Sequence, residues 1–150
     1  MKNILLIMLF VLAVIQFIQP DRNQSGQAAI LDISRIYPVP ESVQGILRES
    51  CYDCHSDNTR YPWYSFSQPA AWWVSSHIRK GKSELNFNQF GSYSARRQRS
   101  KLKSIASSIK DPTMPLPSYT LIHRNALLSA KDRQLILQWT AKMISRSPNK

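Results

Sequence analysis

A five-residue run near the middle of the chain, Cys51-Tyr52-Asp53-Cys54-His55, constrains the sequence more than any other feature. Its two thiols stand three positions apart and a histidine directly follows the second, which is the attachment pattern of a c-type haem. Each thiol can add across one vinyl group of the porphyrin. The imidazole of His55 then lies under the ring, where its nitrogen can bind iron. We therefore expect one covalent haem c, held by Cys51 and Cys54 with His55 as an iron ligand.

Three other uses of these residues stay open at the level of the sequence. The cysteines could form a thiol–disulfide redox motif, although such motifs usually open a helix in a βαβ unit and no such unit is evident. They could belong to a zinc site, and His77 and His123 would then have to complete the ligands because the chain has only two cysteines. They could also form a structural disulfide, with His55 incidental.

The charge of the chain narrows the class of partners. Its 150 residues include 20 lysines and arginines and 9 acidic residues, a formal charge of +11. Such a surface attracts anionic partners, among them lipid headgroups, acidic proteins and nucleic acid. Because the chain opens with an apolar segment of the kind that enters membranes, we expect no nucleic acid. We expect the partners to be the membrane and a redox protein. An acidic surface on that redox protein would complement the positive charge of this chain.

Residues 1–19 are expected to be a signal anchor or a signal peptide. Lys2 precedes an apolar run from Ile4 to Ile18 that only Gln16 interrupts, and a basic start before an apolar run is typical of export signals. No small-x-small cleavage site follows closely, which favours an uncleaved anchor. About 15 helical residues span only ~22 Å, short of the ~30 Å core of a bilayer, but membranes tolerate some mismatch. The basic N-terminus should stay in the cytoplasm. The domain would then face the periplasm from the cell inner membrane, or be released there if the segment is cleaved.

The remaining chain is predicted to be all-α. Residues 20–39 are polar and contain Pro20 and Pro38, which predicts a linker. Residues 40–146 form the predicted haem-binding domain, and residues 147–150 a disordered tail. A period of 3.6 residues among the apolar positions predicts helices, and no stretch alternates as a strand would. The predicted helices cover residues 40–50, 68–80, 94–110 and 129–145.

Helix ends are marked by residues that favour them. Pro69 suits the first turn of the second helix, and Gly81 is expected just past its end as a C′ glycine. Ser129 and Asp132 resemble a capping box at the start of the last helix. The first helix runs directly into Cys51, which is how a short helix presents the haem motif in small cytochromes c.

A second iron ligand is expected from Met114. It lies between Thr113 and Pro115 in a proline-rich loop, 59 residues after His55, so its thioether would lose little conformational freedom on binding iron. His and Met together raise the reduction potential of haem iron and suit electron transfer. His77, on an apolar helix face, is the alternative sixth ligand, and His123 is a weaker third candidate.

Aromatic residues follow the motif closely and are expected to pack against the porphyrin. Four of the six residues from Tyr61 to Phe66 are aromatic, and flat rings pack well on a flat macrocycle. We expect Trp63 and Tyr64 to contribute to such a wall. Ordinary packing in the core is the competing interpretation.

The order of these features is similar to a cytochrome c fold, and the chain resembles more closely a family of small bacterial haem-binding domains. The resemblance covers roughly residues 35–145. It rests on Ser50–Ser56, Tyr61–Tyr64, Trp72-Trp73 with His77-Ile78, Leu85-Asn86-Phe87, and Met114–Tyr119. It implies covalent haem at Cys51 and Cys54, His55 as proximal ligand, and Met114 as distal ligand by position. His77 belongs to the family pattern too.

The expected function is that of a membrane-tethered monohaem cytochrome that passes single electrons outside the cytoplasmic membrane, and not that of an enzyme. The motivation is one haem motif, a sixth ligand and no evident substrate chemistry. A haem-based sensor or a protein that reacts with peroxide or a gas is the alternative, and it would need an open sixth position. A zinc or thiol-redox module is the third interpretation.

Overall fold

A computed structural model describes residues 1–25 and 30–146 of the chain, and the predicted tail over 147–150 lies outside the described residues. The described part is all-helical, as predicted, apart from an isolated bridge between Gln24 and Asn58. Its α-helices are α1 (Lys2–Ile15), α2 (Ile33–Ile36), α3 (Glu41–Ser50), α4 (Tyr52–His55), α5 (Ala70–Glu84), α6 (Ala95–Lys110), α7 (Pro117–Ile122) and α8 (Ala130–Arg146). Short 3-10 turns are η1 (Trp63–Phe66), η2 (Phe87–Ser92) and η3 (Arg124–Ala126).

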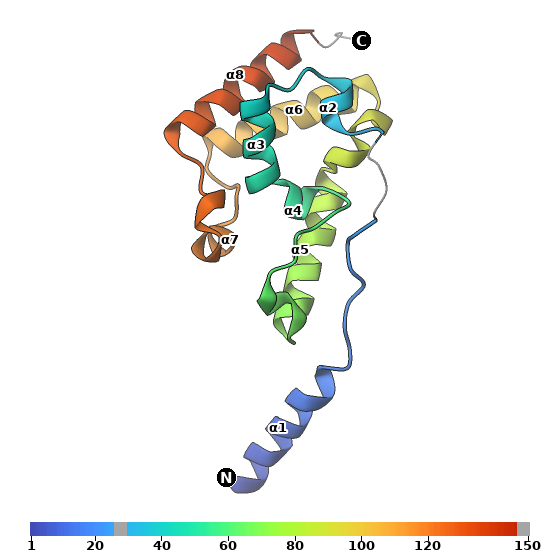
Figure 1. Ribbon diagram of the computed structural model, residues 1–150, viewed down its shortest axis with the longest axis vertical. Helices are drawn as coiled ribbons and strands as arrows, with labels where there is room; N and C mark the ends of the chain where they lie inside the picture. The colour runs from blue at the N-terminus through green and yellow to red at the C-terminus, as the bar shows by residue number, and fades with distance from the viewer. Residues whose placement is uncertain (26–29, 147–150) are drawn as a thin grey trace.

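The three helices with the clearest apolar period form as predicted. Helices α6 and α8 pack along each other at the end of the domain farthest from α1, and α3 packs against α8 (Figure 1). Each turns its apolar face inward, because burying apolar area is the main force that holds such amphipathic helices. The buried stripe residues are Val43 and Leu47 of α3, Leu102, Ile105 and Ile109 of α6, and Ile136, Trp139 and Met143 of α8.

The predicted capping box at the start of α8 is confirmed. The backbone N–H of Asp132 donates to the hydroxyl of Ser129 at 3.1 Å, and the backbone N–H of Ser129 donates to the Asp132 carboxylate at 3.0 Å. Two N–H groups that the helix cannot satisfy by itself are thereby paired.

The prediction for the end of α5 is wrong. Gly81 is not a C′ glycine, because α5 continues for another turn to Glu84 and ends in the extended backbone of Leu85. Gly81 lies inside the helix, where α5 crosses the haem-type motif. A Cβ atom at this position would approach the carbonyl oxygen of Cys54 to 2.7 Å. The glycine therefore permits close helix packing, a role that a sequence pattern does not distinguish from a helix end.

The stretch after α5 has no helical period, yet it supplies two of the largest buried side chains, Phe87 and Phe90. They come from η2, whose three-residue turns do not produce the 3.6-residue pattern of an α-helix. Phe87 stacks on Tyr52 with the ring planes 8° apart, so η2 packs against α4.

The described part of the predicted linker packs on the domain. Ile33 is fully buried, and Asn23 exchanges backbone and side-chain hydrogen bonds with the loop around Thr59. Helix α1 instead projects away from the domain and none of its residues is buried (Figure 1). Among the described residues, no helix has the length and apolar character needed to cross a membrane.

Candidate functional site

The predicted haem motif forms a sharp break between two helices. α3 ends at Ser50, and the backbone N–H of Cys51 still donates to Leu47 at 2.9 Å. The carbonyl of Cys51 then accepts from the backbone N–H groups of Cys54 and His55, at 3.2 and 3.0 Å, and so closes the single turn of α4. This turn brings Cys51, Cys54 and His55 to the wall of one cavity.

Among the cavities that adjoin the motif in the described part of the chain, two have volumes of about 210 and 250 Å³. They share much of their lining and together form what we call the cleft. The shared residues are Ser50, Cys51, His55, Glu84, Met114 and Pro115. The first cavity adds Cys54, His77 and Tyr119, and the second adds Phe87, Ile105 and Ile109 from the core. The cleft thus has the mainly apolar walls with a few polar groups that suit a large flat ligand.

His55 is held in one tautomer and one orientation. Its Nδ1 lies 3.0 Å from the carbonyl oxygen of Leu85, and a carbonyl can only accept a hydrogen bond. The hydrogen therefore sits on Nδ1, and the lone pair of Nε2 is available to a metal. Burial lowers the pKa of His55 below its ordinary value. The imidazole is neutral at pH 7, which is the form that binds iron.

The two cysteines are half-buried free thiols. Burial, with a smaller contribution from the neighbouring Cys54, raises the pKa of Cys51 to about 12. Burial and then the charge of Asp53 raise the pKa of Cys54 to about 11. Both groups stay protonated at neutral pH, which favours neither the thiolate of a redox-active pair nor that of a metal site.

Met114 lies at the cleft with His55 and lines both cavities. It is 38% exposed, so no core packing accounts for its position. His77 lines the first cavity only, and its Nδ1 lies 2.9 Å from the carbonyl of Trp73 one turn earlier in α5. Both candidates for a sixth ligand therefore reach the cleft.

The other predicted site residues lie farther out. His123 lines neither cavity, and its Nε2 instead lies 2.9 Å from the hydroxyl of Tyr64. Tyr64 lines a separate small hollow, which Cys54 and His77 also line. Trp63 is 83% exposed and lines neither cavity. The structure therefore does not bring Trp63 to the cleft.

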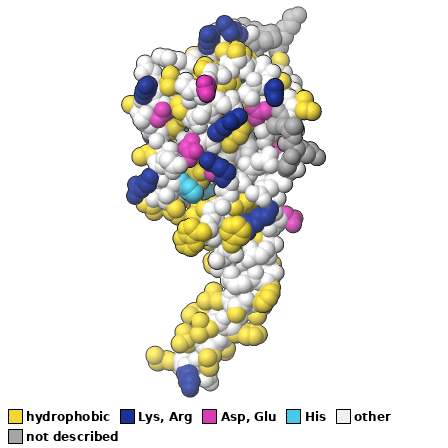
Figure 2. All heavy atoms as spheres, in the orientation of Figure 1, with side chains coloured by type: hydrophobic (Ala, Val, Ile, Leu, Met, Phe, Trp, Pro, Cys, Tyr) yellow, Lys and Arg dark blue, Asp and Glu magenta, His cyan; other side chains and the backbone are white. Residues whose placement is uncertain are grey.

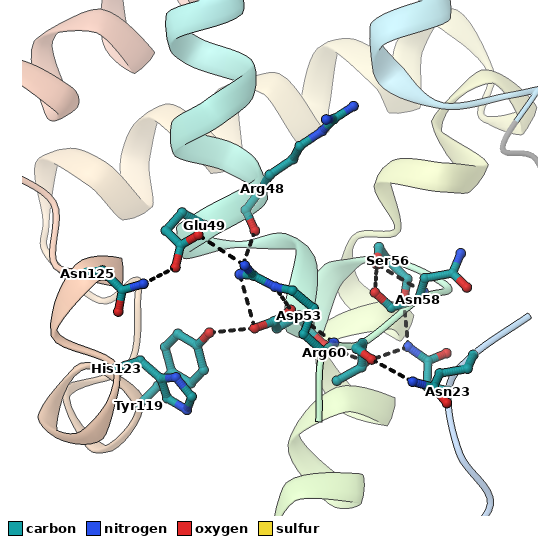
Figure 3. A network of polar contacts seen from close by, with 12 residues as sticks. Asn23, Arg48, Glu49, Asp53, Ser56, Asn58, Arg60, Tyr119, His123 and Asn125 are labelled. Atoms are coloured by element: carbon teal, nitrogen blue, oxygen red, sulfur yellow. Dashed lines mark hydrogen bonds and ion pairs between the residues drawn. The ribbon is translucent and has the colours of Figure 1, made fainter. Parts of the chain in front are cut away.

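The buried carboxylate of Asp53, inside the motif, links α4 to the segment that follows Met114. Asp53 accepts hydrogen bonds from the backbone N–H and the guanidinium of Arg60, at 3.2 and 3.1 Å (Figure 3). It also accepts one from the hydroxyl of Tyr119 at 2.7 Å. Burial and this bond raise the pKa of Tyr119, so the hydroxyl remains a donor. Because α7 follows the Met114 loop directly, the bond fastens that side of the cleft to α4.

A second contact joins the same two sides. The side chain of Asn125 donates to Glu49, which also pairs with Arg60 at 3.1 Å (Figure 3). The segment that follows Met114 is therefore held by α3 and α4 at two points. Sequence reasoning missed Leu85, Asp53 and Tyr119 as functional residues. The only indication in the sequence that these three residues have a functional role is that they lie in the motifs that carry the family resemblance.

The residues present fit a haem. An apolar cleft meets two protonated thiols at the spacing of the attachment pattern, a neutral imidazole with Nε2 available, and a thioether. The described residues form no group of three or more His, Cys, Asp or Glu side chains of the kind that holds a bare metal ion. Fold and site together define an all-helical haem-binding protein.

The comparison with known families agrees with this class. The model of the haem-binding domain family matches residues 10–142, and the chain belongs to that family. No curated protein and no solved structure matches it.

Proposed function

We propose that the chain binds one haem covalently as a c-type cytochrome with a cytochrome c-like arrangement of its helices. Cys51 and Cys54 would each form a thioether, and His55 would bind the iron. The observation that carries the proposal is the bond from His55 Nδ1 to the Leu85 carbonyl, next to two thiols in the same cavity wall. That bond favours the tautomer with its hydrogen on Nδ1, which leaves the lone pair of Nε2 available to iron.

Met114 is the proposed sixth ligand. It lines both cavities together with His55, and the contacts of Tyr119 and Asn125 hold the segment behind it. The bound haem would supply one-electron redox chemistry, and a His–Met pair would raise its reduction potential. The protein's own contribution would be ligation, exclusion of water and a partly open edge through which electrons pass. We propose electron transfer, without catalysis, as the function.

The proposed location is the outer face of the cytoplasmic membrane, with α1 as an uncleaved anchor. α1 is apolar, exposed on all sides and preceded by a positive N-terminus. A soluble redox partner would meet the basic surface of α6, where Arg96, Arg97 and Lys103 are available; an acidic partner fits this charge.

A mass measurement tests covalent attachment. The full chain should be made in a host with haem-attachment machinery, denatured, and extracted with acidified solvent before its intact mass is measured. We expect the mass of chain plus one haem. Cys51→Ala or Cys54→Ala should leave at most one link, and the double variant should lose all haem on extraction. Haem that is extracted from the denatured parent protein would contradict the proposal.

A haem-based sensor is the second candidate, because Met114 is part-exposed and His77 also reaches the cleft. A sixth position that is easily vacated would allow CO or cyanide to bind. Titration of the reduced protein with CO separates the two functions. Rapid and tight binding of CO would favour the sensor, whereas slow or negligible binding of CO would favour the electron carrier.

A further inference from the structure

One end of the domain carries exposed aromatic side chains beside the exit of α1. Trp63 is 83% exposed, Phe66 is 58% exposed, and Trp72 is also exposed. We call these three residues the aromatic end. Figure 2 shows hydrophobic side chains at the end of the domain that faces the helix, and again along the helix itself. Large exposed apolar side chains in one place mark an interaction site, whereas single ones do not.

The aromatic end is fastened to α1. The Gln16 side chain, just past the helix, accepts from the backbone N–H of Gln68 at 2.9 Å. The indole N–H of Trp72 donates to the carbonyl of Ile18 at 3.0 Å, and the side chain of Gln68 donates to the same carbonyl at 2.7 Å. The aromatic end therefore lies in the same environment, water or lipid, as the C-terminal end of α1.

Cations accompany the aromatic rings. The guanidinium of Arg22 lies 4.2 Å from the ring centre of Phe66. Arg22, Arg79 and Lys82 line a hollow beside this segment, with Asp21 as the only acidic residue among its lining. Amphipathic aromatic side chains next to basic ones are typical of protein surfaces at the level of lipid headgroups.

The length of α1 gives an independent argument. Its 14 residues span about 21 Å, roughly 9 Å less than the ~30 Å hydrocarbon core of a bilayer. A helix that is too short draws its flanking residues toward the apolar layer. In this chain the flanking residues are bonded to the aromatic end, so that end is drawn to the membrane surface with them.

We propose that the aromatic end is a second membrane contact, seated in the headgroup layer, which fixes the orientation of the domain on the bilayer. This inference rests on the proposed role of α1 as an anchor. The contact would also set the height of the cleft above the membrane. Gly81 packs against Cys54 of the haem motif and lies nine residues after Trp72 in α5, a distance of about 14 Å along the helix. The haem motif is then held close above the membrane and in a fixed orientation to it.

The test measures depth in the membrane at three positions of the full-length haem-loaded protein. The protein is placed in vesicles of phosphatidylethanolamine and phosphatidylglycerol, and one nitroxide label is attached to each variant, Ser67→Cys, Val11→Cys or Lys131→Cys. The parent protein is the blank for labelling of native thiols. Depth follows from the relative collision rates of the label with oxygen, which enriches in lipid, and with a water-soluble nickel complex.

We expect the label at 67 to lie at headgroup depth, the label at 11 in the hydrocarbon, and the label at 131 in water. Adding Trp63→Ser and Phe66→Ser should move the label at 67 into water and leave the label at 11 in place. Leu127→Ser is the matched control, because Leu127 has the same 58% exposure as Phe66 but lies after η3, and it should change neither label.

Two results would overturn the proposal in different ways. A label at 67 that is as accessible to water as the label at 131, with the label at 11 still buried, would show an anchored protein whose aromatic end is free. A label at 11 in water would show that α1 is not an anchor. The proposed membrane contact of the aromatic end would then be wrong as well.

Discussion

The two sides of the cleft are built in opposite ways. The side that carries Cys51, Cys54 and His55 is a continuous stretch of chain, fixed by backbone hydrogen bonds and by the close approach of α5 at Gly81. The side that carries Met114 is a part-exposed proline-rich loop, and side chains from α3 and α4 hold the segment behind it. The first side therefore depends on local packing, whereas the second depends on a few long-range polar contacts that can be removed one at a time.

The thiols offer the largest expected effect on the first side. If the cleft is formed before haem is attached, the pKa values of about 12 for Cys51 and about 11 for Cys54 leave little thiolate at pH 7. In the haem-free protein, alkylation of Cys51 should be roughly 10³-fold slower than in the denatured chain, and Cys54 should react roughly tenfold faster than Cys51. Timed alkylation followed by peptide mass analysis measures both.

The pH dependence has a definite sign. The unfolded thiols ionise first, so the folded state gains stability from these groups below about pH 9 and loses it as the pH rises toward 11 and 12. The alkylation rate of the folded protein should rise about tenfold per pH unit across pH 7–10. Equal rates for folded and denatured protein would show that the cleft is open without haem.

Gly81→Ala tests the close approach of α5 and α4. The new Cβ would meet the Cys54 carbonyl at 2.7 Å, and a backbone atom cannot rotate aside. We expect a loss of about 3 kcal/mol in the free energy of unfolding, near the upper end for overpacking. Urea denaturation measures it.

Gly45→Ala in α3 is the matched control, because a Cβ there meets nothing within 4 Å. It should gain about 0.5–1 kcal/mol from helix propensity alone. If both substitutions behave alike, Gly81 is not a packing glycine.

Tyr119→Phe tests the second side. It removes one donor from the buried carboxylate of Asp53, and we expect a loss of about 1.5–2 kcal/mol because hydrogen bonds to charged groups are the stronger ones. With α7 released, Met114 should bind iron less firmly and its charge-transfer band should weaken.

The matched control for Tyr119→Phe is Tyr37→Phe. The Tyr37 hydroxyl donates to the side-chain oxygen of Gln98 at 3.0 Å, and neither residue lines the cleft. This variant should lose stability by about 1 kcal/mol and leave the Met band unchanged. A Met band that responds equally to both variants would remove the special role of Tyr119.

Ser129→Ala should have the smallest effect on the cleft. It breaks the capping box of α8, far from the cleft, and should cost about 1 kcal/mol with no change in the haem spectrum. A change in that spectrum would mean that the two sides of the cleft respond to general destabilisation, and that the contrast between them is not real.

The sequence predicted the features that are local in the chain. α3, α6 and α8 have a clear apolar period, and the capping box at Ser129 is visible within four residues. The resemblance led to the haem-binding family, which the family comparison confirms. The covalent link and the iron ligands stay predictions.

The features that escaped prediction depend on contacts between distant residues. The Leu85 carbonyl meets His55 across 30 residues, and Tyr119 meets Asp53 across 66. Neither the hydrophobic period nor the spacing of a motif predicts contacts between residues so far apart in the chain. Gly81 shows a different limit, because a glycine near a helix end has two explanations and only the position of Cys54 separates them.

The central claim is that haem iron lies between His55 and Met114, and the visible absorption spectrum of the haem-loaded protein tests it most directly. We predict a sharp low-spin spectrum when the protein is reduced and a weak Met-to-iron charge-transfer band when it is oxidised. Met114→Ala should abolish that band with haem still attached, and His77→Ala should preserve it. A high-spin spectrum in the parent protein, or a Met114→Ala spectrum identical to it, would contradict the claim.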